Sequence, residues 1–105
     1  MIQVIIKQKK NDIQQISLNG HSEYEVSGKD IVCASASSIL ITSVNAILRY
    51  QKDAIIVEQE DTDTIHVTVT VLKHDSIIDL LLDNLIALLT ELASDYPKNI
   101  RINRK

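Results

Sequence analysis

The feature that most constrains the fold is a strict alternation of apolar and polar residues near the middle of the chain. Between Thr64 and Leu72, an apolar set alternates with a polar set: Ile65, Val67, Val69 and Val71 against Thr64, His66, Thr68 and Thr70. Successive side chains of a strand point to opposite faces, so the pattern predicts a strand with one buried and one polar face. Ala54–Glu60 is the predicted hairpin partner, joined to it by a turn at 61–63. The polar face is either bare to water or covered by a second subunit.

The rest of the chain supplies a second hairpin, two helices and a last strand. Asn11-Asp12 is the turn predicted for the opening hairpin, and residues 20–30 are polar and predict a loop. The helices follow from apolar residues at a helical spacing. The second begins at Ser76, with Asp79 three residues on as an Asp variant of a capping box. The other predicted elements are strands at Ile2–Lys7 and up to Gly20, a helix from Val32 to Leu48, the end of the second helix before Pro97, and a strand at Lys98–Asn103.

This order, ββαββαβ, predicts an α+β fold. Helices with one apolar stripe and strands with one apolar face are satisfied together in a two-layer sandwich, with a mixed or antiparallel sheet and two helices. A chain of 105 residues is the size of one domain, so residues 1–105 are expected to form a single domain. With no Phe and no Trp, Ile, Leu and Val must build its core.

Composition excludes several classes of protein. The net charge of −3 and the scarcity of aromatic residues argue against a direct nucleic-acid partner. The N-terminus lacks the order of a signal peptide, and the uncharged run Ile31–Leu48 contains too many polar residues for a membrane span. A cytoplasmic protein with no membrane partner is expected. One cysteine with scattered histidines does not provide the spacing of a zinc site, so no metal and no cofactor are predicted.

Candidate catalytic residues lie at the two ends of the polar loop. Both glycines of the chain, Gly20 and Gly28, fall in it, His21 stands near its start, and Cys33 follows it. A cysteine and a histidine so placed can serve as nucleophile and base. If Asp30 is the N-cap of the first helix, Cys33 lies in the first turn, where the helix dipole favours a thiolate and unpaired amides can stabilise an oxyanion.

The alternative interpretation is a cysteine without chemistry. Cys33 falls on the same helical arc as Ala36, Leu40 and Val44, and cysteine commonly packs as a small apolar residue. The chain would then be a non-enzymatic homodimeric module that binds a peptide or an assembly partner. Accessibility of the native thiol distinguishes the two interpretations.

The segment from Gly20 to Asn45 resembles the signature of the ribosomal-processing cysteine proteases, the Prp family. The matching residues are Gly20-His21, a variable loop, Gly28, the tetrapeptide Asp30-Ile31-Val32-Cys33, and Ser37, Thr42 and Asn45 in the following helix. Tyr96-Pro97 and the short last strand fit as well.

The resemblance implies a cysteine endopeptidase that removes the N-terminal extension of large-subunit ribosomal protein number twenty-seven and so supports ribosome assembly. It implies Cys33 and His21 as the catalytic pair, a homodimer, and a mobile loop over the substrate cleft. Tyr24, Val26 and Gly28 are then expected to contact the substrate. We expect Asp30 to cap the helix or orient His21, and the amides of Cys33 and Ala34 to hold the oxyanion.

Overall fold

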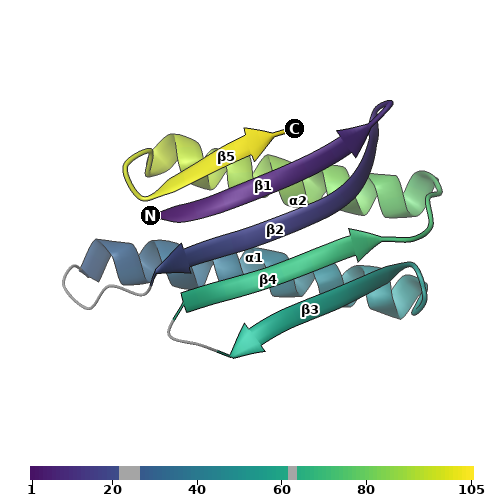
Figure 1. Ribbon diagram of the computed structural model, residues 1–105, viewed down its shortest axis with the longest axis horizontal. Helices are drawn as coiled ribbons and strands as arrows, with labels where there is room; N and C mark the ends of the chain where they lie inside the picture. The colour runs from purple at the N-terminus through teal and green to yellow at the C-terminus, as the bar shows by residue number, and fades with distance from the viewer. Residues whose placement is uncertain (22–26, 62–63) are drawn as a thin grey trace.

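Five strands form one mixed sheet in the described part of the chain. The computed structural model describes the backbone of residues 1–21, 27–61 and 64–105, and the side chains of 1–20, 31–60 and 65–105. The elements in chain order are β1 (Ile2–Lys9), β2 (Asp12–His21), α1 (Ser27–Tyr50), β3 (Ile55–Asp61), β4 (Thr64–Val71), α2 (Ser76–Asp95) and β5 (Ile100–Arg104). The strand order is β3-β4-β2-β1-β5, shown in Figure 1. Only β1 and β5 pair in parallel among these strands.

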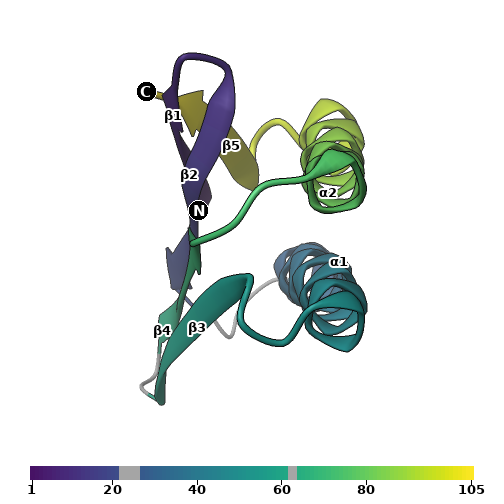
Figure 2. The same ribbon diagram turned by 90° about the vertical axis from the view of Figure 1, so that its right-hand side faces the viewer.

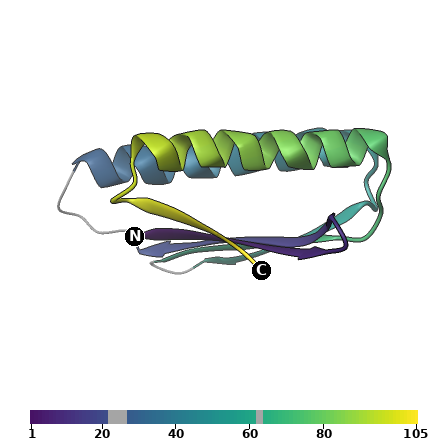
Figure 3. The same cartoon turned by 90° about the horizontal axis from the view of Figure 1, so that it is seen from above.

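Both helices cover the same face of the sheet. Figures 2 and 3 show the sheet as one layer and α1 and α2 side by side as the other. The predicted α+β fold of two layers in the order ββαββαβ is therefore confirmed. The helices run in opposite directions, since α1 begins at the end of the sheet where α2 finishes (Figure 1).

Branched aliphatic side chains fill the space between the layers. Their contributions come from every element, and the largest fully buried side chains are Ile6, Ile16, Leu18, Ile47, Ile78, Leu82, Leu85, Leu89 and Ile100. In β4, Val69 and Val71 are buried, while Ile65 and Val67 pack against the same core at its margin. The alternation in β4 thus places its apolar residues on the helix side, as predicted.

The other face of the sheet carries mostly polar side chains in cross-strand rows. One row, read from β5 to β3, consists of Arg101, Gln3, Asn19, His66 and Glu60. Basic side chains therefore lie toward the β1–β5 edge and acidic ones on β3.

The turn of the first hairpin lies one residue earlier than predicted. Lys10 and Asn11 have φ values of 52° and 74° and form the connection between β1 and β2, while Asp12 already belongs to β2. Two consecutive residues with positive φ match the right-handed twist of the flanking strands, and asparagine tolerates that conformation well. The prediction of Asn11-Asp12 as the turn pair is wrong by this shift.

One helical segment of the described chain, Ile31–Tyr50 in α1, is long and apolar enough by length and composition to cross a membrane. Here its buried side lies on the sheet, which accounts for part of that apolar character. A third of the segment is buried, so much of its surface lies outside the core.

The N-terminus of α2 is capped by Asp75, not by Ser76. Asp75 Oδ1 accepts a hydrogen bond of 2.8 Å from the backbone amide of Ile78, which satisfies one of the unpaired amides of the first turn. The Tyr50 hydroxyl donates to Asp75 Oδ2 at 2.6 Å and ties the end of α1 to the start of α2. The predicted capping-box residue Asp79 instead contacts His74.

These two hydrogen bonds make the stability contribution of Asp75 depend on pH. The bond from the Ile78 amide, followed by that from Tyr50, lowers the pKa of Asp75 below its ordinary value. A lowered folded-state pKa means stabilisation that is complete above the unfolded pKa of about 4 and lost as pH falls through the folded value. We expect Asp75→Ala to lower the Tm at neutral pH, and the deficit relative to the parent to shrink below about pH 4.

Thermal unfolding followed by circular dichroism between acidic and neutral pH tests this expectation. Asp83→Ala, which removes an exposed carboxylate from the same helix, is the matched control and should leave the Tm nearly unchanged. A Tm deficit in Asp75→Ala that stays constant throughout the acidic range would contradict the assignment.

Candidate active site

Cys33 lies on the side of α1 that meets the sheet, at the margin of the core. It is the seventh residue of α1, and its side chain is half-buried and packs against the hydrophobic core. Partial exposure leaves a thiol accessible, in contrast to the fully buried Val32 and Ala36 on either side of it. The position therefore permits a reactive cysteine as well as a packed one.

His21 is the last residue of β2 and is paired across the sheet with Thr64 of β4. The chain continues from there into α1, and Figure 1 shows the end of β2 and the start of α1 at the same end of the molecule. The topology thus brings the backbone of His21 and the helix that carries Cys33 to one end of the sandwich. The side chain of His21 lies outside the described residues.

Gly20 lets the end of β2 approach β1 closely. A Cβ atom at this position would come within 2.9 Å of Ile2 Cγ1 and 3.3 Å of Ile2 Cα, closer than side chains normally pack. Its φ is not positive, so the requirement is for space and not for an unusual backbone conformation. Glycine before His21 therefore allows β2 to remain in register up to the candidate base.

Helix α1 begins earlier than predicted, and this corrects the roles of two residues. The helix starts at Ser27, so Gly28 lies within it and not in a loop, and Asp30 is its fourth residue and not its N-cap. Figure 3 shows the reason: this end of α1 projects beyond the sheet. A helical turn with no sheet beneath it buries nothing, so it needs no apolar residue. Its sequence is therefore as polar as that of a loop, and the apolar spacing that predicts a helix is missing.

The early start also changes the position of the amides of Cys33 and Ala34. Only the first four amides of a helix lack an intrahelical partner, and those of residues seven and eight donate to carbonyls four residues before. The prediction of these two amides as oxyanion donors depends on a helix starting after Asp30, and this helix does not provide it. The helix dipole also acts more weakly on a thiol beyond the first turn.

Two of the predicted substrate contacts belong to residues of the predicted loop before α1. Tyr24 and Val26 lie outside the described residues, so their role as apolar contacts to a peptide stays a prediction.

Asn19 is a polar residue of this region that sequence analysis did not single out. It precedes Gly20-His21 on β2, and its side-chain oxygen is buried with no hydrogen-bond partner among the described residues. A buried acceptor of this kind calls for an N–H donor. Nothing in the sequence distinguishes Asn19 from the other polar residues that alternate along β2.

A groove of about 290 Å³ runs between the two helices and does not include Cys33. Its lining is mostly apolar and comes from both helices: Ser38, Ile39, Thr42, Ser43, Ala46, Leu81, Asn84 and Leu88. The groove is a surface distinct from the candidate catalytic pair.

A half-buried cysteine near the start of a core helix, with a histidine at the end of the preceding strand, is an arrangement suited to a cysteine protease. The comparisons agree, because the family model for cysteine protease Prp matches residues 1–101. The chain belongs to this family, and it is a cysteine protease.

Solved structures support the assignment over the whole chain. The essential ribosomal processing protease Prp from S. aureus in complex with a substrate peptide is 28% identical, with a TM-score of 0.89 and complete coverage of both chains. The same S. aureus protease with a covalently linked product peptide is 29% identical, with a TM-score of 0.88 and complete coverage. The protein SMU.848 from Streptococcus mutans is 23% identical, with a TM-score of 0.90, and shares the fold over 99% of this chain and 93% of its own. No curated protein sequence gave a significant match.

The close approach at Gly20 predicts the effect of adding one methyl group. Gly20→Ala should force β1 and β2 apart beside the candidate base and lower the free energy of unfolding by about 1–3 kcal/mol. Ser17→Ala on the same strand is the matched control and should have little effect. Ile2→Ala removes the Cγ1 atom that the new methyl group would meet, so the cost of Gly20→Ala should be smaller in that background. Urea denaturation of the parent, the two single variants Gly20→Ala and Ile2→Ala, and the double variant measures this coupling. Equal costs of Gly20→Ala in the parent and in Ile2→Ala would contradict the steric explanation.

Proposed function

We propose that this protease removes the N-terminal extension of large-subunit ribosomal protein number twenty-seven and thereby supports ribosome assembly in the cytoplasm. The observation that carries the proposal is the match of fold and sequence, over the full chain, to a ribosomal processing protease crystallised with its substrate peptide. The signature from Gly20-His21 to Cys33 in this chain supports the same activity.

The proposed catalytic pair is Cys33 as nucleophile and His21 as base. His21 takes the proton of the Cys33 thiol, and the thiolate attacks the carbonyl carbon of the scissile peptide bond. His21 then gives this proton to the departing amine. A water molecule activated by His21 attacks the thioester, which releases the acid product and restores the thiol. The half-buried position of Cys33 suits this role because one side of the thiol is held by the core while the other is accessible.

Asp30, the fourth residue of α1, is proposed as a residue that orients the base His21.

The alternative of a binding module with an inert cysteine is not supported by these findings. Membership of a cysteine protease family makes the chain an enzyme. The intermediate exposure of Cys33 also differs from the complete burial expected of a cysteine that only fills space.

A cleavage assay on the precursor of the proposed substrate tests the function. Purified protein is incubated with the full-length ribosomal precursor, and product mass is measured. We expect cleavage by the parent, and loss of cleavage by at least about a thousandfold in Cys33→Ala and in His21→Ala, because nucleophile and base act as a unit. His66→Gln, which changes a histidine of β4, is the control and should remain active.

Two outcomes would count against this function. Turnover of the precursor by Cys33→Ala would remove Cys33 as nucleophile. Cleavage of unrelated peptides, with the precursor left intact, would leave a cysteine protease with a different substrate.

We further propose that the enzyme acts as a homodimer formed through the outer surface of the helices. Large apolar side chains stay exposed there, notably Ile41 at 58% and Leu80 at 66%, beside the groove between α1 and α2. The sequence of α1 from Ile31 to Leu48 carries no charged residue, and charge depletion is the compositional mark of the centre of a protein interface. A second copy presents the same uncharged surface, so the two can be buried against each other.

Sedimentation equilibrium tests the proposed dimer. Ile41→Glu should shift the parent dimer toward monomer, because it places a charge in the apolar contact. Ile56→Glu is the matched control, since Ile56 is comparably exposed at 48% but lies on β3 in the other layer. A monomeric parent would reject the dimer. Dissociation caused by Ile56→Glu and not by Ile41→Glu would place the interface elsewhere.

A further inference from the structure

Three side chains with metal-binding atoms converge at the end of the molecule opposite the catalytic residues. Asp12 begins β2, His74 lies in the connection from β4 to α2, and Asp79 lies in the first turn of α2. Their ligand atoms all lie within 4.8 Å of one another. Figures 1 and 3 both show the β1–β2 turn and the β4–α2 connection at the same end of the sandwich.

The distance between one pair of these atoms matches that of two ligands of a single ion. His74 Nδ1 lies 2.8 Å from Asp79 Oδ1. Neighbouring ligands at right angles around an ion bound at about 2.1 Å are roughly 3 Å apart, so these two atoms already have the spacing of adjacent ligands. Asp12 is exposed and its side chain can rotate to complete the group.

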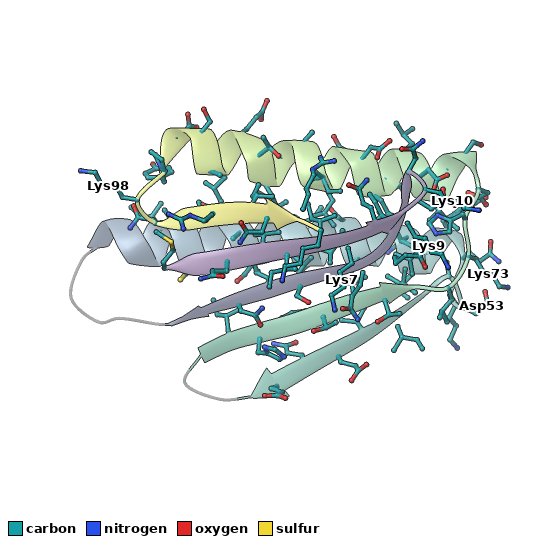
Figure 4. The ribbon with its side chains drawn as sticks, turned by 45° about the horizontal axis from the view of Figure 1, so that its top comes forward. Lys7, Lys9, Lys10, Asp53, Lys73 and Lys98 are labelled. Carbon is teal, nitrogen blue, oxygen red and sulfur yellow. The ribbon has the colours of Figure 1, made fainter. Side chains whose placement is uncertain are left out.

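The charges around the cluster favour a cation. Asp12 and Asp79 bring two carboxylates together, and neither forms a salt bridge with lysine or arginine among the described side chains. Lysines are present at this end, where Figure 4 labels Lys9, Lys10 and Lys73. However, Lys73 is engaged at 2.7 Å by Asp53, whose pKa it holds below the ordinary value.

The positive end of the α2 dipole opposes a cation at Asp79. This effect amounts to about half an elementary charge, whereas the two carboxylates carry two full negative charges. In addition, Asp75 already caps the helix and accepts from its first-turn amide. The two carboxylates therefore outweigh the helix dipole at the cluster.

We propose that Asp12, His74 and Asp79 bind a divalent transition-metal ion such as Zn²⁺ or Mn²⁺. One imidazole nitrogen with two carboxylate oxygens suits these borderline ions better than soft ions that prefer thiolates. Three protein ligands leave the remaining positions to water.

The bound ion stabilises the fold and does not take part in peptide cleavage. It links the β1–β2 turn to the start of α2, two segments that are more than sixty residues apart in the chain. β2 has ten residues, so at about 3.3 Å per residue its two ends, Asp12 and His21, lie roughly 30 Å apart. The proposed site is therefore remote from Cys33.

Metal titration of a Cys33→Ala protein tests the proposal, because this background removes the thiol as a competing ligand. The protein is freed of metal with a chelator, then titrated with Zn²⁺, Mn²⁺ and Co²⁺. Binding is followed by calorimetry, by the Tm, and by the visible absorption of Co²⁺. We expect each chain to bind one ion, and the Tm to rise as this site becomes occupied. Asp12→Asn, His74→Gln and Asp79→Asn should each weaken binding by at least roughly tenfold.

Two matched controls separate this cluster from other groups. Asp53→Asn removes a carboxylate from the same end of the molecule, and His66→Gln removes a histidine from β4; both should bind the ion as the parent does. No saturable binding up to about 1 mM metal would overturn the proposal. Undiminished binding in the three ligand variants would overturn it as well. Neither result depends on proteolysis, so the outcome is independent of the proposed function.

Discussion

The structure depends on the burial of one face of the sheet under two helices. With no Phe and no Trp, the layer between them is filled by Ile, Leu and Val, whose branched side chains must interlock to leave no voids. Removing one such side chain typically costs about 2–5 kcal/mol, a large part of the stability of a domain of this size. The same burial decides the position of the candidate catalytic residues. α1 lies on the sheet through Val32, Ala36 and Leu40, and Cys33 is held at the margin of that contact, with His21 at the end of a neighbouring strand.

The two ends of the sandwich then differ in what they can do. At one end β2 stops and α1 begins, next to the close contact of Gly20 with Ile2, and the candidate residues His21 and Cys33 belong to these two elements. At the other end the β1–β2 turn, the β4–α2 connection and the start of α2 lie together, as Figure 1 shows. Polar contacts fasten the β4–α2 connection and α2 to each other and to the end of α1. Tyr50 and Asp75 join the two helices, Lys73 pairs with Asp53, and His74 contacts Asp79. The first end carries the candidate catalytic pair, and the second carries polar contacts between distant parts of the chain.

Several parts of this arrangement could be predicted from the sequence because they rest on local physics. The alternation in β4 and the helical spacing in α2 specify elements whose apolar residues must face one core. The structure has most of them there, while Ile77, Leu80 and Leu88 of α2 are exposed. The first residues of the helices are harder to predict from sequence, since the free energy of a single turn decides where a helix begins. The sequence does not predict the start of α1 at Ser27, because polar residues suit both a loop and a helical turn that projects beyond the sheet. The sequence predicts that α2 begins at Ser76, whereas Asp75 caps it. Asp75 also receives a hydrogen bond from Tyr50, twenty-five residues earlier, which nothing in the local sequence reveals.

The sequence by itself determined the fold class, the order of the elements, the family and the candidate pair of Cys33 and His21. Each of these depends on residue spacing within one continuous segment, where the geometry of a strand or helix is known in advance. Only the tertiary structure decided that Asp12, His74 and Asp79 meet, that the oxygen of Asn19 is buried without a partner among the described residues, and that Gly20 is needed for space against Ile2. These relations join residues from different strands and helices. They arise from how the sheet pairs and how the helices pack on it, and no spacing along the chain encodes such distances.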